Sequence, residues 1–120
     1  LMVDDQPNLT DFYARIAKAL HLTPVVASSV PEAVDALERR GKPTFVLTDL
    51  HLGTSDGIDL VEFVREEYGS TLPILVVSGL NDDDVEQRAK SAGATDFVAK
   101  PIGRRALFAR IQSLLPATYS

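Results

Sequence analysis

Cysteine is absent from this chain of 120 residues, which excludes disulfide bonds, thiolate catalysis and cysteine-ligated zinc sites. No apolar run approaches the roughly 20 residues that a membrane-spanning helix needs. Basic residues are few: 12 lysines and arginines stand against 17 aspartates and glutamates, and the net charge is −5. A domain this acidic lacks the broad positive surface with which proteins bind nucleic acids or anionic membranes.

What remains is the composition of an ordinary soluble domain, with 45% hydrophobic and 24% charged residues. It excludes a disordered tail, a collagen-like fibre and a coiled coil. A chain of this length forms one hydrophobic core without disulfides or metals, so we expect a single domain over residues 1–120. Because the chain opens on an apolar stretch rather than on methionine, we also expect a domain cut from a longer chain, with the start of its first strand missing.

Short apolar runs alternate with helical patterns along the chain. The runs predict strands buried on both faces of a sheet, over residues 1–3, 24–27, 44–48, 72–77 and 96–99. Between and after them, apolar residues recur every three or four positions, which predicts helices, over residues 9–20, 30–37, 60–64, 85–89 and 107–114. This alternation predicts an α/β domain with a parallel sheet and helices on both faces.

Capping residues support the helical assignments. Asn8 or Thr10 is expected to cap the first helix, and Ser29 the second, because a side-chain oxygen there accepts a bond from a free backbone N–H. Asn81 or Asp82 is expected to cap the fourth.

Polar residues follow four of the five predicted strands: Asp4 and Asp5, Asp49, Ser78, and Lys100. Ligands of an open parallel sheet bind outside the carboxyl ends of its strands, so we expect these residues to meet at one edge. Two carboxylates about 4 Å apart repel by about 4 kcal/mol at an effective dielectric of 20, so three of them need protons or a cation. Oxygen ligands favour Mg²⁺ or Mn²⁺ over zinc. The set therefore suggests phosphoryl transfer to an aspartate, with Asp49 attacking in line.

Each of these residues taken alone also fits an ordinary structural role. Asp5 suits a turn or a helix cap, and Ser78 before Gly79 suits a turn. Lys100 suits a solvated surface position. Their occurrence at the same end of separate strands is what favours a common site.

Six motifs between residues 3 and 101 add to this set. In order and spacing they resemble the receiver domain of two-component response regulators, and the resemblance extends over residues 2–115. The resemblance implies a doubly wound, flavodoxin-like sheet of five parallel strands in the order 2-1-3-4-5, with the site at its switch point. The motifs are Val3-Asp4-Asp5 with Pro7, Leu47-Thr48-Asp49-Leu50, Asp56-Gly57, Pro73-Ile74-Leu75-Val76-Val77-Ser78-Gly79, Ala92-Gly93-Ala94 and Phe97-Val98-Ala99-Lys100-Pro101.

The same resemblance implies a role for each residue at the acidic edge. Asp49 is implied to accept the phosphoryl group. Asp5, Asp49 and the backbone carbonyl of His51 are implied to bind Mg²⁺ (or Mn²⁺), with Asp4 acting through a water. Lys100 is implied to bridge the acceptor carboxylate and then the phosphoryl group. The domain would catalyse its own phosphorylation and dephosphorylation, so it is not an enzyme in the usual sense.

The resemblance also implies a switch. Ser78 is implied to move toward the phosphoryl group while Phe97 turns inward, and the peptide bond between Lys100 and Pro101 is implied to be cis. The surface of the last two helices and the last strand would then change and control an effector domain or a downstream protein. The implied donors are a sensor histidine kinase, a phosphotransfer protein or a small phosphodonor, in the cytoplasm, and a homodimer stays open.

Several positions depart from the family pattern. Gly53 stands where the family usually has proline, Ser55 replaces an apolar residue, and Ile102 replaces a common phenylalanine. His51 and Leu80 occupy the two positions that tune the lifetime of the acyl phosphate in the family. Leu80 has no group that could position an attacking water, whereas the His51 ring would either position one or crowd the site.

Two other functions compete with the receiver. A degenerate receiver would bind partners without phosphorylation, but the complete set of Asp4, Asp5, Asp49, Ser78 and Lys100 argues against it. A phosphatase of the haloacid-dehalogenase type would need a second acid two residues after its nucleophile, where this chain has His51.

Overall fold

The computed structural model describes residues 1–52, 55–79 and 83–115, and the side chain of Ser55 lies outside this description. The strands are β1 (Met2–Val3), β2 (Val26–Ala27), β3 (Val46–Thr48), β4 (His51–Leu52), β5 (Ser55–Asp56), β6 (Ile74–Ser78) and β7 (Asp96–Ala99). The helices are α1 (Pro7–Ala19), α2 (Val30–Arg40), α3 (Gly57–Tyr68), α4 (Asp83–Ala92) and α5 (Arg104–Leu114). None of these helices is both long enough and apolar enough to cross a membrane.

The main sheet has five parallel strands in the order β2-β1-β3-β6-β7. Counting only these strands along the chain, the order is 2-1-3-4-5, so the predicted fold class is confirmed. Val3 of β1 pairs with both Ala27 of β2 and Thr48 of β3. This register brings the chain segments that follow β1 and β3 side by side, and the switch point of the sheet lies between them.

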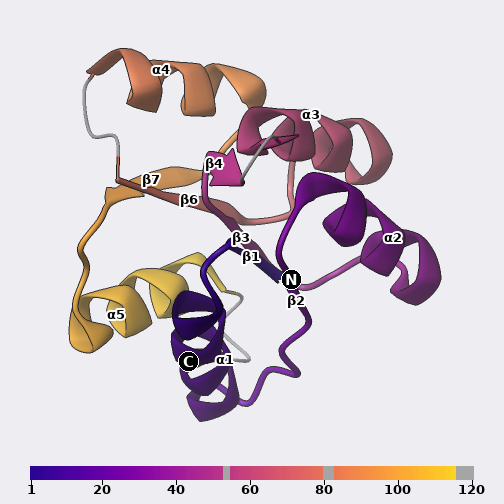
Figure 1. Cartoon of the computed structure of the whole chain (residues 1–120). Coiled ribbons are helices and arrows are strands. Elements are labelled where there is room, and N and C mark those ends of the chain that lie inside the picture. The colour runs from indigo at the N-terminus through magenta and orange to yellow at the C-terminus, as the bar shows by residue number, and fades with distance from the viewer. Residues whose placement is uncertain (53–54, 80–82, 116–120) are drawn as a thin grey trace.

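Helices cover both faces of the sheet, with α1 and α5 on one face and α2, α3 and α4 on the other (Figure 1). Successive side chains of a strand point to opposite faces of the sheet, so each strand contributes apolar residues to a hydrophobic core on both faces. Leu47 and Leu75 pack with buried residues of α1 and α5. Val46 and Ile74 pack with buried residues of α2, α3 and α4. The sheet is therefore buried on both sides, which explains the continuous apolar runs of the sequence.

The helix caps confirm one sequence expectation and correct another. The Ser29 hydroxyl accepts a hydrogen bond from the backbone N–H of Glu32 at 3.2 Å, as a helix cap does. The first helix begins earlier than predicted: Gln6 is its N-cap, without a side-chain hydrogen bond, and Pro7 opens the helix. The expected caps Asn8 and Thr10 are therefore helical residues. Proline at the first helical position has a φ suited to the helix and loses no hydrogen bond there.

A short hairpin follows β3, which the sequence did not predict. Its strands β4 and β5 are antiparallel, and His51 pairs with Asp56. Gly57 begins α3 directly after it, and its N–H donates to the carbonyl of Leu50 at 2.9 Å. A Cβ atom on Gly57 would lie 2.0 Å from the backbone oxygen of Asp49. Only glycine permits this close approach, which holds the start of α3 against the end of β3.

Candidate functional site

Two carboxylates lie side by side at the carboxyl edge of the sheet. Asp4 follows β1 and is 1% exposed, and Asp49 follows β3 and is 6% exposed. The parallel register places them there, and the backbone N–H of Asp49 donates to the carbonyl of Val3 at 3.1 Å. Asp5, by contrast, is exposed. Of the three carboxylates predicted to meet at this edge, Asp4 and Asp49 therefore lie together and buried, whereas Asp5 is exposed.

Lys100 joins the two buried carboxylates. Its Nζ donates to Asp4 Oδ2 at 2.8 Å and to Asp49 Oδ2 at 2.6 Å. Lys100 directly follows β7, and its backbone N–H donates to the carbonyl of Ser78 at 2.7 Å, which fixes the start of the loop beside β6. The peptide bond between Lys100 and Pro101 is cis, as expected. Residues from three strand ends thus meet in one cluster of ion pairs.

Charges in this cluster stabilise one another. Burial by itself lowers the pKa of the Lys100 ammonium, but its hydrogen bonds and charge attraction to Asp4 and Asp49 outweigh burial and raise the pKa above 10.5. Removing one partner of a buried ion pair leaves an uncompensated charge, which is costly. Two carboxylates against one ammonium leave one net negative charge, so the edge is suited to a further cation.

Backbone N–H groups donate hydrogen bonds to the remaining oxygen of both carboxylates. Asp4 Oδ1 accepts from the N–H of Gln6 at 3.0 Å, and Asp49 Oδ1 accepts from the N–H of His51 at 3.2 Å. His51 therefore contributes through its backbone, while the residue itself is exposed. In each carboxylate, one oxygen accepts a hydrogen bond from a backbone N–H and the other accepts one from Lys100.

Tyr13 also contacts this site, and the sequence analysis did not predict this contact. Its hydroxyl donates to Asp4 Oδ2 at 3.4 Å, from a side chain that is 1% exposed. Burial, the charges of Asp4 and Asp49, and the hydrogen bond to Asp4 raise the pKa of Tyr13 above its ordinary 10.0, so the phenol keeps its proton. The helical spacing of α1 marks position 13 only as a core position. The polar tip of a buried tyrosine is the one available signal, because such a hydroxyl usually has a partner.

Ser78 and Phe97 lie in the neighbouring strands β6 and β7. Ser78 ends β6 and is fully buried. Phe97 is 9% exposed and packs in the core beneath α2, α3 and α4. The aromatic side chain is thus inward in this conformation, and its movement between two positions stays a prediction.

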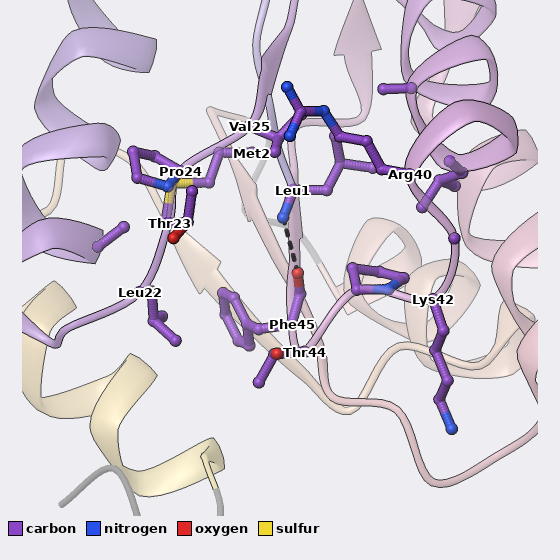
Figure 2. A pocket seen from close by; sticks show the side chains of 15 residues that line it. Leu1, Met2, Leu22, Thr23, Pro24, Val25, Arg40, Lys42, Thr44 and Phe45 are labelled. Carbon is purple, nitrogen blue, oxygen red and sulfur yellow. Dashed lines mark hydrogen bonds between the residues drawn. The ribbon is translucent and has the colours of Figure 1, made fainter.

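A cavity of about 310 Å³ lies away from these residues. It is lined by the start of β1 and by the segments that precede β2 and β3, including Leu1, Pro24 and Phe45 (Figure 2). The backbone nitrogen of Leu1 donates to the carbonyl of Phe45 at 2.9 Å. None of the acidic-edge residues Asp4, Asp49 and Lys100 lines the cavity, so it is not part of the candidate site.

Comparison with known proteins decides the family. A family model described as the response regulator receiver domain matches residues 1–112. The chain belongs to the response regulator receiver domains. Receivers are the regulated modules of two-component signalling, and the expected family is therefore confirmed.

Two curated relatives of this receiver are named as response regulators. The heme response regulator HssR of Staphylococcus saprophyticus is 24% identical over 115 residues, which cover 96% of this chain and 50% of HssR. The DNA-binding response regulator MtrA of Mycolicibacterium smegmatis is 30% identical over 115 residues, with 96% and 49% covered. The receiver thus spans about half the length of these relatives.

A solved structure of similar fold is also a receiver domain. The receiver domain of NtrX from Brucella abortus has a TM-score of 0.85 and 27% sequence identity, and 95% of each chain is covered. The chemotaxis protein CheY4 of Vibrio cholerae has a TM-score of 0.87 at 21% identity, again over 95% of each chain, and shows the fold alone.

The donors at the receiver's acidic edge are oxygens, which are the ligands that Mg²⁺ prefers. In this conformation the positive charge between Asp4 and Asp49 is the Lys100 ammonium. Among residues 1–52, 55–79 and 83–115, no three His, Asp or Glu side chains are gathered in a metal-binding arrangement. The carboxylate oxygens of Asp4 and Asp49 are donors of the kind that suits a divalent cation, while the metal-binding roles of Asp5 and of the His51 backbone carbonyl stay predictions.

Other positions singled out by the sequence lie outside the described residues. They are Gly53, Leu80, Asn81 and Asp82, and the side chain of Ser55. The proposed caps of α4 and one of the two positions that tune the acyl phosphate are among them, so these predictions stay as they were.

Proposed function

We propose that this receiver is a phosphorylation-gated switch whose phosphoryl acceptor is Asp49. The observation that carries the proposal is the bridge from Lys100 Nζ to Asp49 Oδ2 at 2.6 Å. It supports the proposal because the Lys100 ammonium contacts the carboxylate oxygen that would carry the phosphoryl group, and its charge would then stabilise the phosphoryl oxygens. The backbone N–H of His51 holds the other oxygen. The carboxylate is thereby oriented before any donor arrives.

The proposed reaction transfers one phosphoryl group without any redox change. An oxygen of the Asp49 carboxylate attacks phosphorus and forms a new P–O bond. The bond from phosphorus to the donor breaks, and the donor leaves as histidine imidazole or, from acetyl phosphate, as acetate. The Lys100 ammonium would move from the carboxylate oxygens to the phosphoryl oxygens, where the negative charge then lies. Later attack by water on phosphorus restores Asp49 and releases inorganic phosphate.

A bound Mg²⁺ would be held by Asp5, Asp49 and the backbone carbonyl of His51, with Asp4 close by. When present, it would neutralise charge that develops on the phosphoryl oxygens. Asp4 pairs with the Lys100 ammonium at 2.8 Å and would keep it in place until transfer.

The output surface we propose is formed by α4, β7 and α5. New charge at Asp49 would draw the Ser78 hydroxyl toward it, and Phe97 of β7 would follow that shift. Arg110 of α5 donates to Asp96 of β7 at 2.6 Å, so the strand and the helix are already tied together at the surface. A sensor histidine kinase or a phosphotransfer protein would supply phosphate, and an effector would receive the change.

Intact-mass measurement tests this function directly. The chain is incubated with acetyl phosphate, once with Mg²⁺ and once with a chelator. We expect the mass of one added phosphoryl group with Mg²⁺ and none with the chelator. An unchanged mass in both samples, from protein that is folded by circular dichroism, would contradict the proposal and favour a receiver that only binds partners.

A further inference from the structure

Two donors share a single oxygen of Asp4. Lys100 Nζ donates to Oδ2 at 2.8 Å, and the Tyr13 hydroxyl donates to the same Oδ2 at 3.4 Å. The other oxygen, Oδ1, is occupied by the N–H of Gln6. Asp4 and Tyr13 are each 1% exposed, so bulk water does not compete for this contact.

The Tyr13 hydroxyl has no role in apolar packing. Its ring lies in the core between the sheet, α1 and α5, where a phenylalanine of the same shape would fill the same space. Phe12 is the adjacent residue, with ring centroids 5.9 Å apart. A buried hydroxyl is unfavourable unless it has a hydrogen-bond partner, and the partner of the Tyr13 hydroxyl is Asp4. The hydroxyl therefore belongs to the acidic site rather than to the core.

Phosphoryl transfer to Asp49 would change the hydrogen-bond donors around Asp4. In the proposed reaction Lys100 moves to the phosphoryl oxygens, and Asp4 Oδ2 then loses its charged donor. A buried carboxylate oxygen without a donor is strongly unfavourable. A donor that stays behind lowers the cost of this move, and Tyr13 is fixed on α1 beside the oxygen that is vacated.

We infer that Tyr13 is a positioning residue that takes over Asp4 Oδ2 when Lys100 leaves for the phosphoryl group. The inference rests on the proposed function and adds a specific residue to it. The hydrogen bond at 3.4 Å is long while Lys100 shares the oxygen, and it should shorten once the ammonium has left. Tyr13 would thus favour the phosphorylated state without touching the reacting atoms.

The test uses the variant Tyr13→Phe and beryllofluoride, a mimic of the phosphoryl group, with Mg²⁺ present. Calorimetry gives the affinity for beryllofluoride, and Tyr68→Phe, in α3, is the matched loss of a hydroxyl. One buried hydrogen bond corresponds to roughly a fivefold change in an equilibrium constant. We expect Tyr13→Phe to bind beryllofluoride about fivefold more weakly and Tyr68→Phe to bind like the unmodified chain.

A second background separates positioning from packing. In Lys100→Ala, Tyr13 is left as the side-chain donor to Oδ2 before and after binding, so its removal should not change the affinity further. A role in packing alone would give the same loss in both backgrounds. Equal losses would therefore overturn the inference, as would an unchanged affinity of Tyr13→Phe in a chain that otherwise binds. Failure of the unmodified chain to bind beryllofluoride would instead overturn the proposed function and this inference with it.

Tyrosine absorption gives a measurement that does not depend on the Tyr13 variant folding. The chain has three tyrosines and no tryptophan, so tyrosine dominates its near-ultraviolet spectrum. Beryllofluoride should shift the tyrosine band to longer wavelength as the phenol hydrogen bond strengthens. The shift should persist in Tyr68→Phe and disappear in Lys100→Ala. A spectrum that beryllofluoride leaves unchanged in the unmodified chain, despite binding, would overturn the inference.

Discussion

Asp49→Asn should take up no phosphoryl group from acetyl phosphate and Mg²⁺. An amide oxygen is a far weaker nucleophile than a carboxylate, and an acyl phosphate cannot form without loss of the amide nitrogen. The variant should still fold, because asparagine has nearly the same volume and Lys100 keeps its ion pair with Asp4 at 2.8 Å. Intact mass under the conditions used for the unmodified chain measures the outcome.

Asp35→Asn is the matched control for this variant. Asp35 lies on α2 in an exposed ion pair with Arg39 at 2.6 Å, and its substitution makes the same chemical change at a solvent-exposed position. It should gain one phosphoryl group like the unmodified chain. Phosphoryl uptake by Asp49→Asn would show that another residue is the acceptor.

Gly57→Ala should be strongly destabilising. The new Cβ would lie 2.0 Å from the Asp49 carbonyl oxygen and 2.9 Å from the Leu50 Cα, and both are backbone atoms that no rotamer change can move away. Relief requires the end of β3 and the start of α3 to separate. We expect a loss of about 3 kcal/mol or more in the free energy of unfolding, which denaturation in urea measures. Phosphoryl uptake should fall as well, because the displaced backbone carries Asp49.

Gly79→Ala is the control for the backbone change itself. A Cβ at Gly79 meets nothing within 4 Å, and this glycine is not among those with positive φ. Its unfolding free energy should stay within about 1 kcal/mol of the unmodified chain. Equal stability of the Gly57 and Gly79 variants would contradict the close approach between α3 and β3.

The sheet and the place of the site were predictable because parallel strands impose both. Continuous apolar runs with intervening helical spacing allow few arrangements other than a sheet covered on both faces. Residues that end such strands share one edge, so the sequence alone predicts that Asp4 and Asp49 lie together. Lys100 is 96 positions from Asp4 in the sequence, and topology alone brings the two together.

The details that the sequence missed depend on how elements pack rather than on local pattern. The hairpin of β4 and β5 has strands of two residues each, too short for any alternation to show. Tyr13 reaches Asp4 because of how α1 is rotated against β1, and helical spacing gives only the buried side of the helix. The capping preferences of Asn8 and Thr10 predict a start of α1 that is too late, whereas the helix begins at Pro7, a residue suited to the first helical position.

The measurement that tests the central claim most directly is to locate the phosphoryl group in the unmodified chain. After phosphorylation by acetyl phosphate with Mg²⁺, borohydride reduces an aspartyl phosphate to homoserine, which peptide mass spectrometry places in the sequence. The account predicts homoserine at position 49 and nowhere else. Label at Asp4 or Asp5, or a phosphoryl group on His51 or Ser78 that resists reduction, would contradict it.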